Sequence, residues 1–244
     1  MGIRPGLAGV AAGAILAPVL LGQGLYVRRV TPRLPEPAGS RCGRVGSGPL
    51  LKLLIIGDSA AAGVGVNDQR QALAGRLAVA LSNHFELHWR LIARTGVTTR
   101  DALATVQASA PESFDVVVTS LGVNDVISRL NLSSWRHEQR RLREQLRSRF
   151  GIRQLIVTGL PPMGWFPALP QPLRWYLGQR AGWLDRMLRE DLAQEPDAEF
   201  LSVAFGPEKT LMASDGFHPG AAAYRQWAEA VAELIVARHG TAAA

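Results

Sequence analysis

Leu53-Leu54-Ile55-Ile56-Gly57-Asp58-Ser59 decides the fold, because four large aliphatic residues in succession stop abruptly at Gly-Asp-Ser. Such a run, closed by a glycine, predicts a strand that is buried on both faces. Residues 60–65 are alanine, glycine and one valine, so the backbone can turn tightly after the strand. Ser59 therefore lies at the carboxyl end of a buried strand, where open α/β sheets bind their ligands. By itself this stretch fits a functional serine and a serine that only caps the next turn equally well.

Strand-like and helix-like segments alternate through the rest of the chain. Apolar runs predict further strands at 87–93, 114–120 and 154–158, and a weaker one at 200–203. Apolar residues at helical spacing predict helices at 68–82, 99–109, 135–150 and 221–237. Alternating strands and helices form mainly parallel sheets with helices on both faces. We therefore expect an α/β domain with three layers and a doubly wound, mainly parallel sheet.

Three later segments carry polar residues of the types that catalysis uses. Gly96 follows the predicted strand at 87–93, and Asn124 in Gly122-Val123-Asn124-Asp125 follows the predicted strand at 114–120. Asp215-Gly216-Phe217-His218-Pro219 stands just before the last predicted helix. Together with Ser59, three of the four segments thus lie at strand ends.

Ser59, Gly96, Asn124 and His218, in this order and with these neighbours, resemble the four blocks of the SGNH hydrolases, also called the GDSL esterase/lipase family. The resemblance covers residues 51–239 and implies a flavodoxin-like SGNH fold. Each block occurs by chance, but four in order are a specific signal. The sequence departs from the family pattern where Ala60 replaces a common leucine and where Ala-Arg-Thr-Gly lacks the frequent preceding asparagine. Neither departure removes a catalytic group, but both weaken any transfer of substrate preference.

The residue types suit nucleophilic catalysis. A serine hydroxyl becomes a good nucleophile when a neighbouring base takes its proton, and an unperturbed histidine has a pKa of about 6.5. Asp215 precedes His218 by three residues, so the two side chains can face one another within one turn and the carboxylate can fix the imidazole tautomer. The alternative to a catalytic role is that His218 only belongs to the N-terminal cap region of a surface helix. We predict Ser59, Asp215 and His218 as catalytic residues.

Acyl transfer also needs donors directed at the developing oxyanion. The resemblance assigns this oxyanion hole to the backbone N–H groups of Ser59 and Gly96 and to the side-chain amide of Asn124. An amide donates without carrying charge, and a glycine lets its backbone approach closely. Asn124 could otherwise be only a turn residue. We expect Asp58 and Asp125 to be structural, bonding loop N–H groups.

The segment 160–170, Leu-Pro-Pro-Met-Gly-Trp-Phe-Pro-Ala-Leu-Pro, follows the strand at 154–158. It has too many prolines for a helix and is more apolar than a typical solvent-exposed loop. We interpret it as a wall or lid for an acyl chain and predict Met163, Trp165 and Phe166 as substrate-binding residues. The alternatives are a loop packed on the core and a membrane contact.

Four arginines of the helix at 135–150 fall on one helical face, at spacings of four, three and four: Arg136, Arg140, Arg143 and Arg147. One explanation is a solvated face with partial pairing to Glu138 and Glu144. The other is a surface that rests on anionic lipid headgroups.

Composition and motif spacing argue against several classes of protein. The chain has 244 residues and a formal net charge of +7, but arginine is spread along its whole length, so nucleic-acid binding is not expected. Cys42 is the only cysteine, and no Cys/His cluster has metal-ligand spacing. The serine is not in G-x-S-x-G, and the nearby glycines lack the spacing of a nucleotide-binding loop. We expect no cofactor and no metal.

The composition of the N-terminal residues predicts a membrane segment. Residues 6–27 carry no charge and are long enough to cross a bilayer, although glycines, alanines and Pro18 make them only moderately apolar. We expect residues 1–30 to be an uncleaved transmembrane anchor in a bacterial inner membrane; a cleavable signal peptide is the alternative. Arginines after the span favour a cytoplasmic domain, whereas many members of the resembled family act outside the cytoplasm. Residues 31–50 are predicted to be an extended linker, followed by the hydrolase domain at 51–239.

The sequence thus predicts a membrane-anchored serine esterase that acts on a small ester or lipid-like substrate through an acyl-enzyme. Lysophospholipase, thioesterase and carbohydrate O-acetylesterase activities are alternatives on the same site. The alternative of another class is a non-catalytic, membrane-tethered binding domain. The oligomeric state and the substrate are left open.

Overall fold

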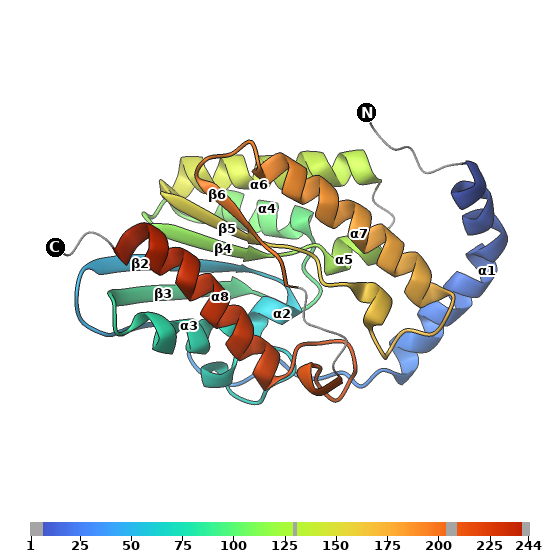
Figure 1. Ribbon diagram of the computed structural model, residues 1–244, viewed down its shortest axis with the longest axis horizontal. Coiled ribbons are helices and arrows are strands. Elements are labelled where there is room, and N and C mark those ends of the chain that lie inside the picture. Colours follow the sequence, from blue (N-terminus) through green and yellow to red (C-terminus); the bar gives the residue numbers. More distant parts are fainter. Residues whose placement is uncertain (1–6, 129–130, 204–208, 241–244) are drawn as a thin grey trace.

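β2 (Leu50–Gly57) lies at the centre of a six-stranded sheet (Figure 1). The structure, a computed structural model, describes residues 7–128, 131–203 and 209–240. The other strands are β1 (Cys42–Val45), β3 (Glu86–Ala93), β4 (Val116–Ser120), β5 (Gln154–Thr158) and β6 (Ala198–Leu201), in the spatial order β1-β3-β2-β4-β5-β6. All neighbours pair in parallel except β1, which runs antiparallel to β3 at the edge.

The buried strand predicted from the aliphatic run is confirmed in β2. Leu53, Leu54 and Ile55 are fully buried, and successive residues point to opposite faces. Leu54 and Ile56 join the apolar core on one face, and Leu53 and Ile55 join the core on the other. A strand that feeds two cores must be apolar at every position, which is why its sequence shows no alternation.

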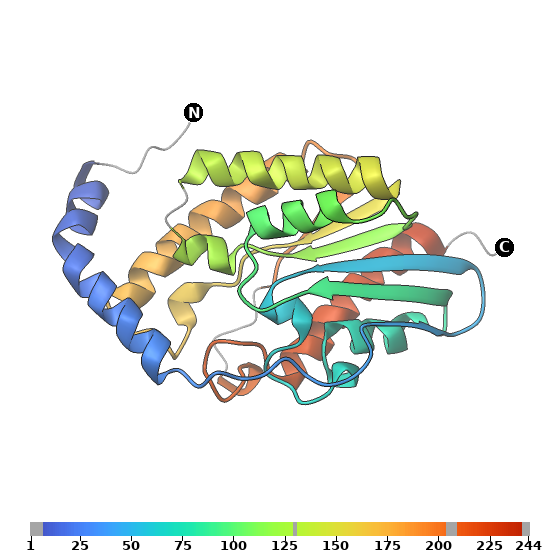
Figure 2. The same ribbon diagram turned by 180° about the vertical axis from the view of Figure 1, so that it is seen from behind.

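Helices cover both faces of the sheet (Figure 2). α3 (Leu73–Leu81) and α8 (Ala221–His239) pack on one face, and α4 (Thr99–Ala108), α6 (Leu132–Phe150) and α7 (Leu173–Leu192) pack on the other. The predicted mixed α/β fold with a mainly parallel sheet is therefore confirmed. The chain leaves β2 to form β3 on one side and then crosses to form β4 on the other. The carboxyl end of β2 is consequently a topological switch point, where ligands bind in sheets of this kind.

The sequence analysis did not predict α7, although its apolar residues have helical spacing. Leu173, Leu177, Leu184 and Leu188 are all buried along one face of this helix. The prolines of residues 160–172 are typical of a loop, and the last of them, Pro172, stands directly before the first residue of the helix. The helix predicted at 68–82 is divided at Ala72, whose backbone is extended, into η1 (Gln69–Gln71) and α3. Four short helical turns were not predicted: α2 (Ser59–Ala62), α5 (Val123–Ile127), η2 (Met163–Trp165) and η3 (Lys209–Leu211).

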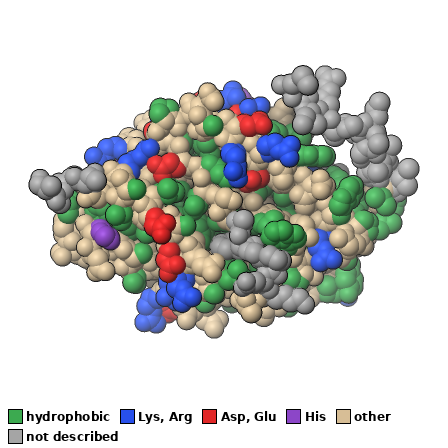
Figure 3. All heavy atoms as spheres, viewed as in Figure 1, with side chains coloured by type: hydrophobic (Ala, Val, Ile, Leu, Met, Phe, Trp, Pro, Cys, Tyr) green, Lys and Arg blue, Asp and Glu red, His purple; other side chains and the backbone are tan. Residues whose placement is uncertain are grey.

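The N-terminal segment forms a helix, α1 (Leu7–Val30), that lies beside α7. In the described part of the chain, no helix combines the length and the apolar character that crossing a bilayer requires. The predicted anchor is therefore not confirmed, and residues 1–6 of it lie outside the described residues. Gln23 interrupts the apolar stretch and hydrogen-bonds to α7: its Nε2 donates to the Gln171 carbonyl at 2.6 Å, and its Oε1 accepts from the Leu173 N–H at 3.0 Å. Figure 3 shows hydrophobic side chains on the surface at this end of the molecule, and those of Leu21, Leu25 and Tyr26 are exposed.

Residues 31–49, which we expected to be an extended linker, contact the sheet along much of their length. They supply β1, and the Ala38 carbonyl accepts from the Gln69 N–H at 2.8 Å. Glu36 Oε1 accepts from the Thr95 N–H at 2.7 Å and from the Thr95 hydroxyl at 2.9 Å. Arg41 joins this contact, since its guanidinium donates to Glu36 at 3.2 Å and to the Ala93 carbonyl at 2.9 Å.

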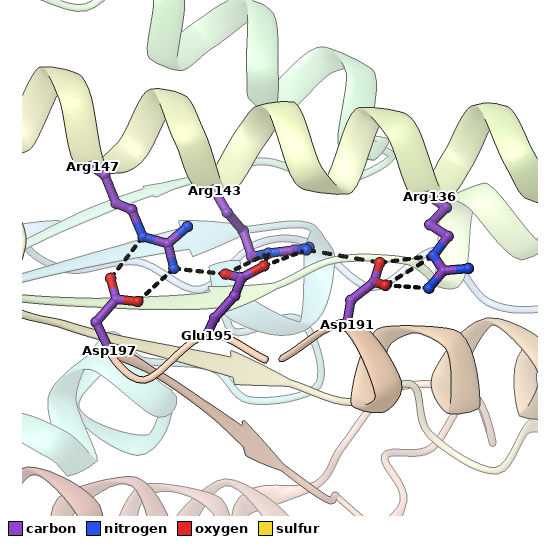
Figure 4. A network of polar contacts seen from close by, with 6 residues as sticks. All are labelled: Arg136, Arg143, Arg147, Asp191, Glu195 and Asp197. Carbon is purple, nitrogen blue, oxygen red and sulfur yellow. Dashed lines mark hydrogen bonds and ion pairs between the residues drawn. The ribbon is translucent and has the colours of Figure 1, made fainter. Parts of the chain in front are cut away.

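Three arginines of α6 form ion pairs with three carboxylates at the end of α7 and in the connection to β6 (Figure 4): Arg136, Arg143 and Arg147 with Asp191, Glu195 and Asp197. Arg143 is the buried member, with 2% of its side chain exposed, and its Nη2 lies 2.9 Å from Glu195 Oε1. Three of the four arginines in the predicted stripe thus pair with carboxylates far along the chain, and Glu144 is not among the partners. Only Arg140 of the four is fully exposed, so the stripe is not a free basic surface.

Replacing Arg143 by alanine should lower the free energy of unfolding by about 2–3 kcal/mol, because Glu195 and Asp191 each lose their buried partner and keep only Arg147 and Arg136. The measurement is urea unfolding at neutral pH. Arg140→Ala is the matched control, because it removes an exposed arginine from the same helix and should have little effect. Equal stability losses in the two variants would contradict a structural role for the ion-pair network.

Candidate active site

Ser59 is the first residue of α2, directly after β2. Asp58 begins this helix: its N–H donates to the Ser120 carbonyl of β4 at 3.1 Å, and its Oδ1 accepts from the Ala60 N–H at 3.0 Å. Asp58 is therefore an N-cap, and the Ser59 N–H has no acceptor within the helix. Burial raises the pKa of the Asp58 carboxyl to about 7. A buried carboxyl group, that of Asp58, therefore fixes the start of α2 and with it the position of Ser59.

His218 connects the serine to Asp215. His218 Nε2 lies 2.9 Å from Ser59 Oγ, and His218 Nδ1 lies 2.5 Å from Asp215 Oδ2. The first of these contacts joins residues that stand 159 positions apart in the sequence. The predicted Ser59, His218 and Asp215 thus lie in one hydrogen-bonded row.

Asp215 is the fixed end of this row. Its other oxygen, Oδ1, accepts from the N–H groups of Phe217 at 2.9 Å and His218 at 3.0 Å. Burial alone would raise the pKa of Asp215, but the hydrogen bonds from His218 and from these two N–H groups outweigh burial and lower it. An ionised carboxylate that is satisfied on both oxygens accepts from Nδ1–H and leaves Nε2 as the base toward serine.

The loop that carries His218 is fixed against the loop that carries Ser59. Gly65 has φ +110°, and a Cβ there would lie 2.2 Å from the Pro219 carbonyl oxygen, so only glycine allows this approach. Tyr224 of α8 adds a second connection, because its hydroxyl lies 2.9 Å from the Ala60 carbonyl and 2.7 Å from the Val64 carbonyl. These contacts determine the distance between nucleophile and base.

Gly96 and Asn124 come from the loops that follow the neighbouring strands. Ala93 at the end of β3 and Ser120 at the end of β4 both pair with Gly57 in the sheet register, so the two loops start on either side of the serine. Gly96 has φ +83°, a conformation that favours glycine, and open space lies above its Cα. The Asn124 amide donates to the Val97 carbonyl at 2.9 Å, and its second N–H proton is available to a ligand.

Asp125 is a structural neighbour of these donors. Its carboxylate accepts from the Thr99 N–H at 3.1 and 3.2 Å and from the Thr99 hydroxyl at 2.9 Å. Burial raises the pKa of Asp125 to about 6, although the bonds from Thr99 act in the opposite direction. The contact ties the loop after β4 to the start of α4, which agrees with the structural role expected for this residue.

Two hollows lie at this end of the sheet and share Pro161 as a lining residue. The first, of about 600 Å³, is lined by Ser59, His218 and Phe166 and extends toward α8. The second, an open groove of about 780 Å³, is lined by Trp165 and by Trp175 of α7, and Pro161 lines both. Among the predicted substrate residues, Phe166 and Trp165 therefore each line one hollow. Met163 is fully buried in the core and lines neither.

The row of serine, histidine and aspartate can move a proton from a hydroxyl to an imidazole, and the neighbouring N–H groups can stabilise a developing negative oxygen. In the described residues, no three potential metal ligands are grouped closely enough to hold a metal ion. Glu36, Tyr224 and Trp175 were not predicted from the sequence. Tyr224 has the spacing of a core residue in α8, and no sequence pattern distinguishes Glu36 from other charged residues of its segment.

The sequence profile of the GDSL-like lipase/acylhydrolase family matches residues 55–226. A search of curated protein sequences finds no significant match.

Solved structures of several esterases share the fold. A carbohydrate esterase family 2 enzyme from Corynascus thermopiles is 16% identical, covers 79% of this chain and 68% of its own, and superposes with a TM-score of 0.59. TesA is 23% identical, with coverages of 74% and 95% and a TM-score of 0.57. Est24, a carbohydrate acetylesterase from Sinorhizobium meliloti, is 18% identical, with coverages of 77% and 99% and a TM-score of 0.57.

The raised pKa of Asp58 predicts a pH-dependent cost in stability. The pKa is about 7 in the folded state against an ordinary value of 3.8, so the folded protein binds the proton more tightly than the unfolded chain. The stability gained from this tighter proton binding is complete below about pH 4 and is lost as the pH rises through about 7. Asp58→Asn cannot ionise, so its advantage over the native protein should grow between pH 4 and pH 7, by at most about 4 kcal/mol.

The measurement is thermal unfolding of both proteins across this pH range. Asp115→Asn is a suitable control, because that aspartate is only half-buried and pairs with the exposed Arg153. A difference between Asp58→Asn and the native protein that does not change with pH would show that Asp58 ionises normally.

Proposed function

The chain belongs to the GDSL-like lipase/acylhydrolase family and is an ester-hydrolysing enzyme, and on this premise we propose that it is a serine esterase with Ser59 as nucleophile, His218 as general base and Asp215 as the residue that orients the histidine. The observation that carries the proposal is the hydrogen-bonded row from Ser59 Oγ through both His218 nitrogens to Asp215. A silent binding domain would have no need of this geometry.

The first half of the reaction forms an acyl-enzyme. Ser59 Oγ attacks the ester carbonyl carbon while its proton passes to His218 Nε2. The resulting imidazolium is stabilised by Asp215, whose lowered pKa keeps it ionised. His218 then gives the proton to the leaving alcohol as the carbon–oxygen bond breaks.

The second half of the reaction hydrolyses the acyl-enzyme. A water molecule takes the place of the alcohol, loses a proton to His218 Nε2 and attacks the acyl carbon. The bond to Ser59 breaks, and the serine oxygen recovers its proton from the imidazolium. Every proton transfer in the cycle uses the same nitrogen, which is why the contact with Ser59 must be held so closely.

The oxyanion of each tetrahedral intermediate needs donors that are in place before the reaction. The proposed donors are the N–H of Ser59 at the start of α2, the N–H of Gly96 and the amide of Asn124. The bond from Asn124 to the Val97 carbonyl fixes its amide beside the Gly96 loop. Glu36 fixes the same loop from outside through Thr95, so we assign Glu36 as a positioning residue.

The shape of the two hollows supports a short acyl group and a bulky alcohol. The hollow beside Ser59 has mainly apolar walls, including Leu121, Phe166 and Val203, and the more open groove is suited to a larger leaving group. A second candidate function is hydrolysis of acyl esters of carbohydrates. The groove favours it, because Trp165 and Trp175 are about half exposed there and offer flat apolar faces next to the polar side chains of Gln179 and Asp185. Two of the structural neighbours are carbohydrate esterases.

Ser59→Ala should abolish hydrolysis of p-nitrophenyl acetate and butanoate while the melting temperature stays close to that of the native protein, because the change removes a single oxygen. The native protein should also be labelled by a fluorophosphonate probe, and Ser59→Ala should not. Labelling of the variant, or turnover above one hundredth of the native rate, would assign the nucleophile elsewhere.

Glu36→Ala should lower kcat about tenfold with little change in KM, because loosening the Gly96 loop weakens a donor that acts mainly in the transition state. Glu36→Gln keeps an oxygen that can accept from the Thr95 N–H, so it should recover most of the activity. The matched control is Glu112→Ala, since this glutamate also pairs with an arginine, Arg90 of β3. The role of Glu36 would be refuted if glutamine and alanine at position 36 reduced kcat equally.

If the groove binds a carbohydrate, Trp165→Ala and Trp175→Ala should each lower kcat/KM for acetylated xylo-oligosaccharides at least tenfold more than kcat/KM for p-nitrophenyl acetate. Trp183→Ala is the control, because this tryptophan is also partly exposed on α7 but lines neither hollow. Parallel losses on both substrates would remove the carbohydrate ester from consideration and leave the esterase assignment intact.

A further inference from the structure

Two residues that line the hollow beside Ser59 carry a buried polar atom that has no hydrogen-bond partner among the described residues. Thr158, at the end of β5, and Trp227, in α8, both line the hollow. Thr158 is 2% exposed and Trp227 is 3% exposed. Neither Thr158 Oγ1 nor Trp227 Nε1 has a hydrogen-bond partner in the described part of the chain.

The two side chains point into the same layer of the fold. Successive residues of β5 alternate between the faces of the sheet. Ile156 belongs to the core under α8, and Gln154 donates to the Leu234 carbonyl of α8 at 3.2 Å. Thr158 is two positions beyond Ile156, so its hydroxyl lies on the α8 face as well. Trp227 belongs to the same core from the opposite side.

A buried hydroxyl or indole N–H that makes no hydrogen bond costs about 1–3 kcal/mol. Most buried polar side chains therefore have partners, and one without a partner requires an explanation. Two such side chains, Thr158 and Trp227, line one hollow, and this hollow is also lined by the nucleophile. Valine would fill the position of Thr158 without that cost, so its hydroxyl has no evident packing role.

We propose that this hollow binds the acyl group of the substrate and selects acyl chains that carry an oxygen, as hydroxyacyl or oxoacyl esters do. The indole N–H of Trp227 is a donor only, and the Thr158 hydroxyl both donates and accepts. A hydroxyl oxygen on the chain accepts from Trp227 and donates to Thr158, and a keto oxygen accepts from both. The remaining walls, including Leu121, Val203 and Met212, are apolar and suit the carbon atoms of a short chain.

The proposal rests on the proposed serine esterase function and specifies its substrate class. The other polar side chains that line the hollow are Asp58, Ser59, Ser120 and His218. Ser59 and His218 belong to the reaction, and Asp58 Oδ1 is already bonded to the Ala60 N–H. Thr158 and Trp227 are the two whose buried polar atoms lack a partner in the described residues, so we assign recognition of the acyl chain to them. A site built to hydrogen-bond an oxygen rejects the analogue that lacks it.

The test compares p-nitrophenyl esters in matched pairs, with the full chain as the enzyme. One pair is 3-hydroxybutanoate and 3-methylbutanoate, and the other is 4-oxopentanoate and 4-methylpentanoate. Within each pair an oxygen replaces a carbon of similar size. Each kcat/KM is divided by the rate of hydroxide-catalysed hydrolysis of the same ester, which removes the intrinsic difference in reactivity. The native enzyme should prefer the oxygenated member of at least one pair about tenfold.

Variants assign the preference to the two side chains. Thr158→Val keeps the shape of the side chain and removes its polar atom, and Trp227→Phe removes the indole N–H together with part of the ring, so each should reduce the preference toward one. The matched control is Thr119→Val, because Thr119 is a buried threonine of the neighbouring strand that does not line the hollow. It should keep the native preference. Only the ratio within a pair is interpreted, since either variant can alter the absolute rate.

A native enzyme without preference in both pairs would overturn the proposal, as would a preference that survives in both variants. Because these esters would still be hydrolysed, that result would leave the serine esterase function in place. Failure to hydrolyse any of the esters, together with failure to react with a fluorophosphonate, would instead remove the proposed function, and the acyl selectivity would fall with it.

Discussion

The buried hydroxyl of Tyr224 connects the two ends of the domain, and the site depends on this connection. It lies within hydrogen-bonding distance of the Ala60 and Val64 carbonyls, so α8 is fixed to the turn that follows the nucleophile. His218 stands six residues before Tyr224, directly ahead of α8. The nucleophile and its base come from opposite ends of the sequence, and local structure alone does not hold them 2.9 Å apart. The close approach of Gly65 to Pro219 completes the constraint.

Three buried aspartates around the site differ in charge because their surroundings differ. Asp215 receives hydrogen bonds on both oxygens, and its pKa is lowered despite burial. Burial dominates at Asp58 and Asp125, and their pKa values rise to about 7 and about 6. At neutral pH, Asp215 is therefore fully ionised, whereas Asp58 is divided between its neutral and ionised forms. A second full charge at Asp58 would lie beside the serine, where the reaction must stabilise a negative oxygen.

Segments outside the hydrogen-bonded set of Ser59, His218 and Asp215 support this set from two sides. Residues 31–41 precede the part of the chain that matches the family profile, which begins at residue 55, yet Glu36 binds the loop of Gly96. On the far side, the arginines of α6 bind carboxylates between α7 and β6, which fixes the strand that follows. α7 itself carries Trp175, so its position determines the width of the open groove. The shape of both hollows is thus set by elements that contribute nothing to proton transfer.

The sequence by itself determined the class of fold and the identity of the polar residues at the strand ends. The aliphatic run of β2 is apolar at every position because both faces are covered, and that pattern can be read without coordinates. The spacing of Asp215 and His218 is likewise local, and their predicted contact is present; their chemical roles stay predictions. Other features depend on residues far apart in sequence: the contact of Glu36 with Thr95, the pairing of Arg143 with Glu195, and the burial of Met163 beside the exposed Trp165. The anchor at residues 1–30, expected from local hydropathy, was not confirmed. Periodicity reports which side of an element is apolar, but only tertiary packing decides what that side meets, and therefore which polar atoms find partners and which are left facing the substrate.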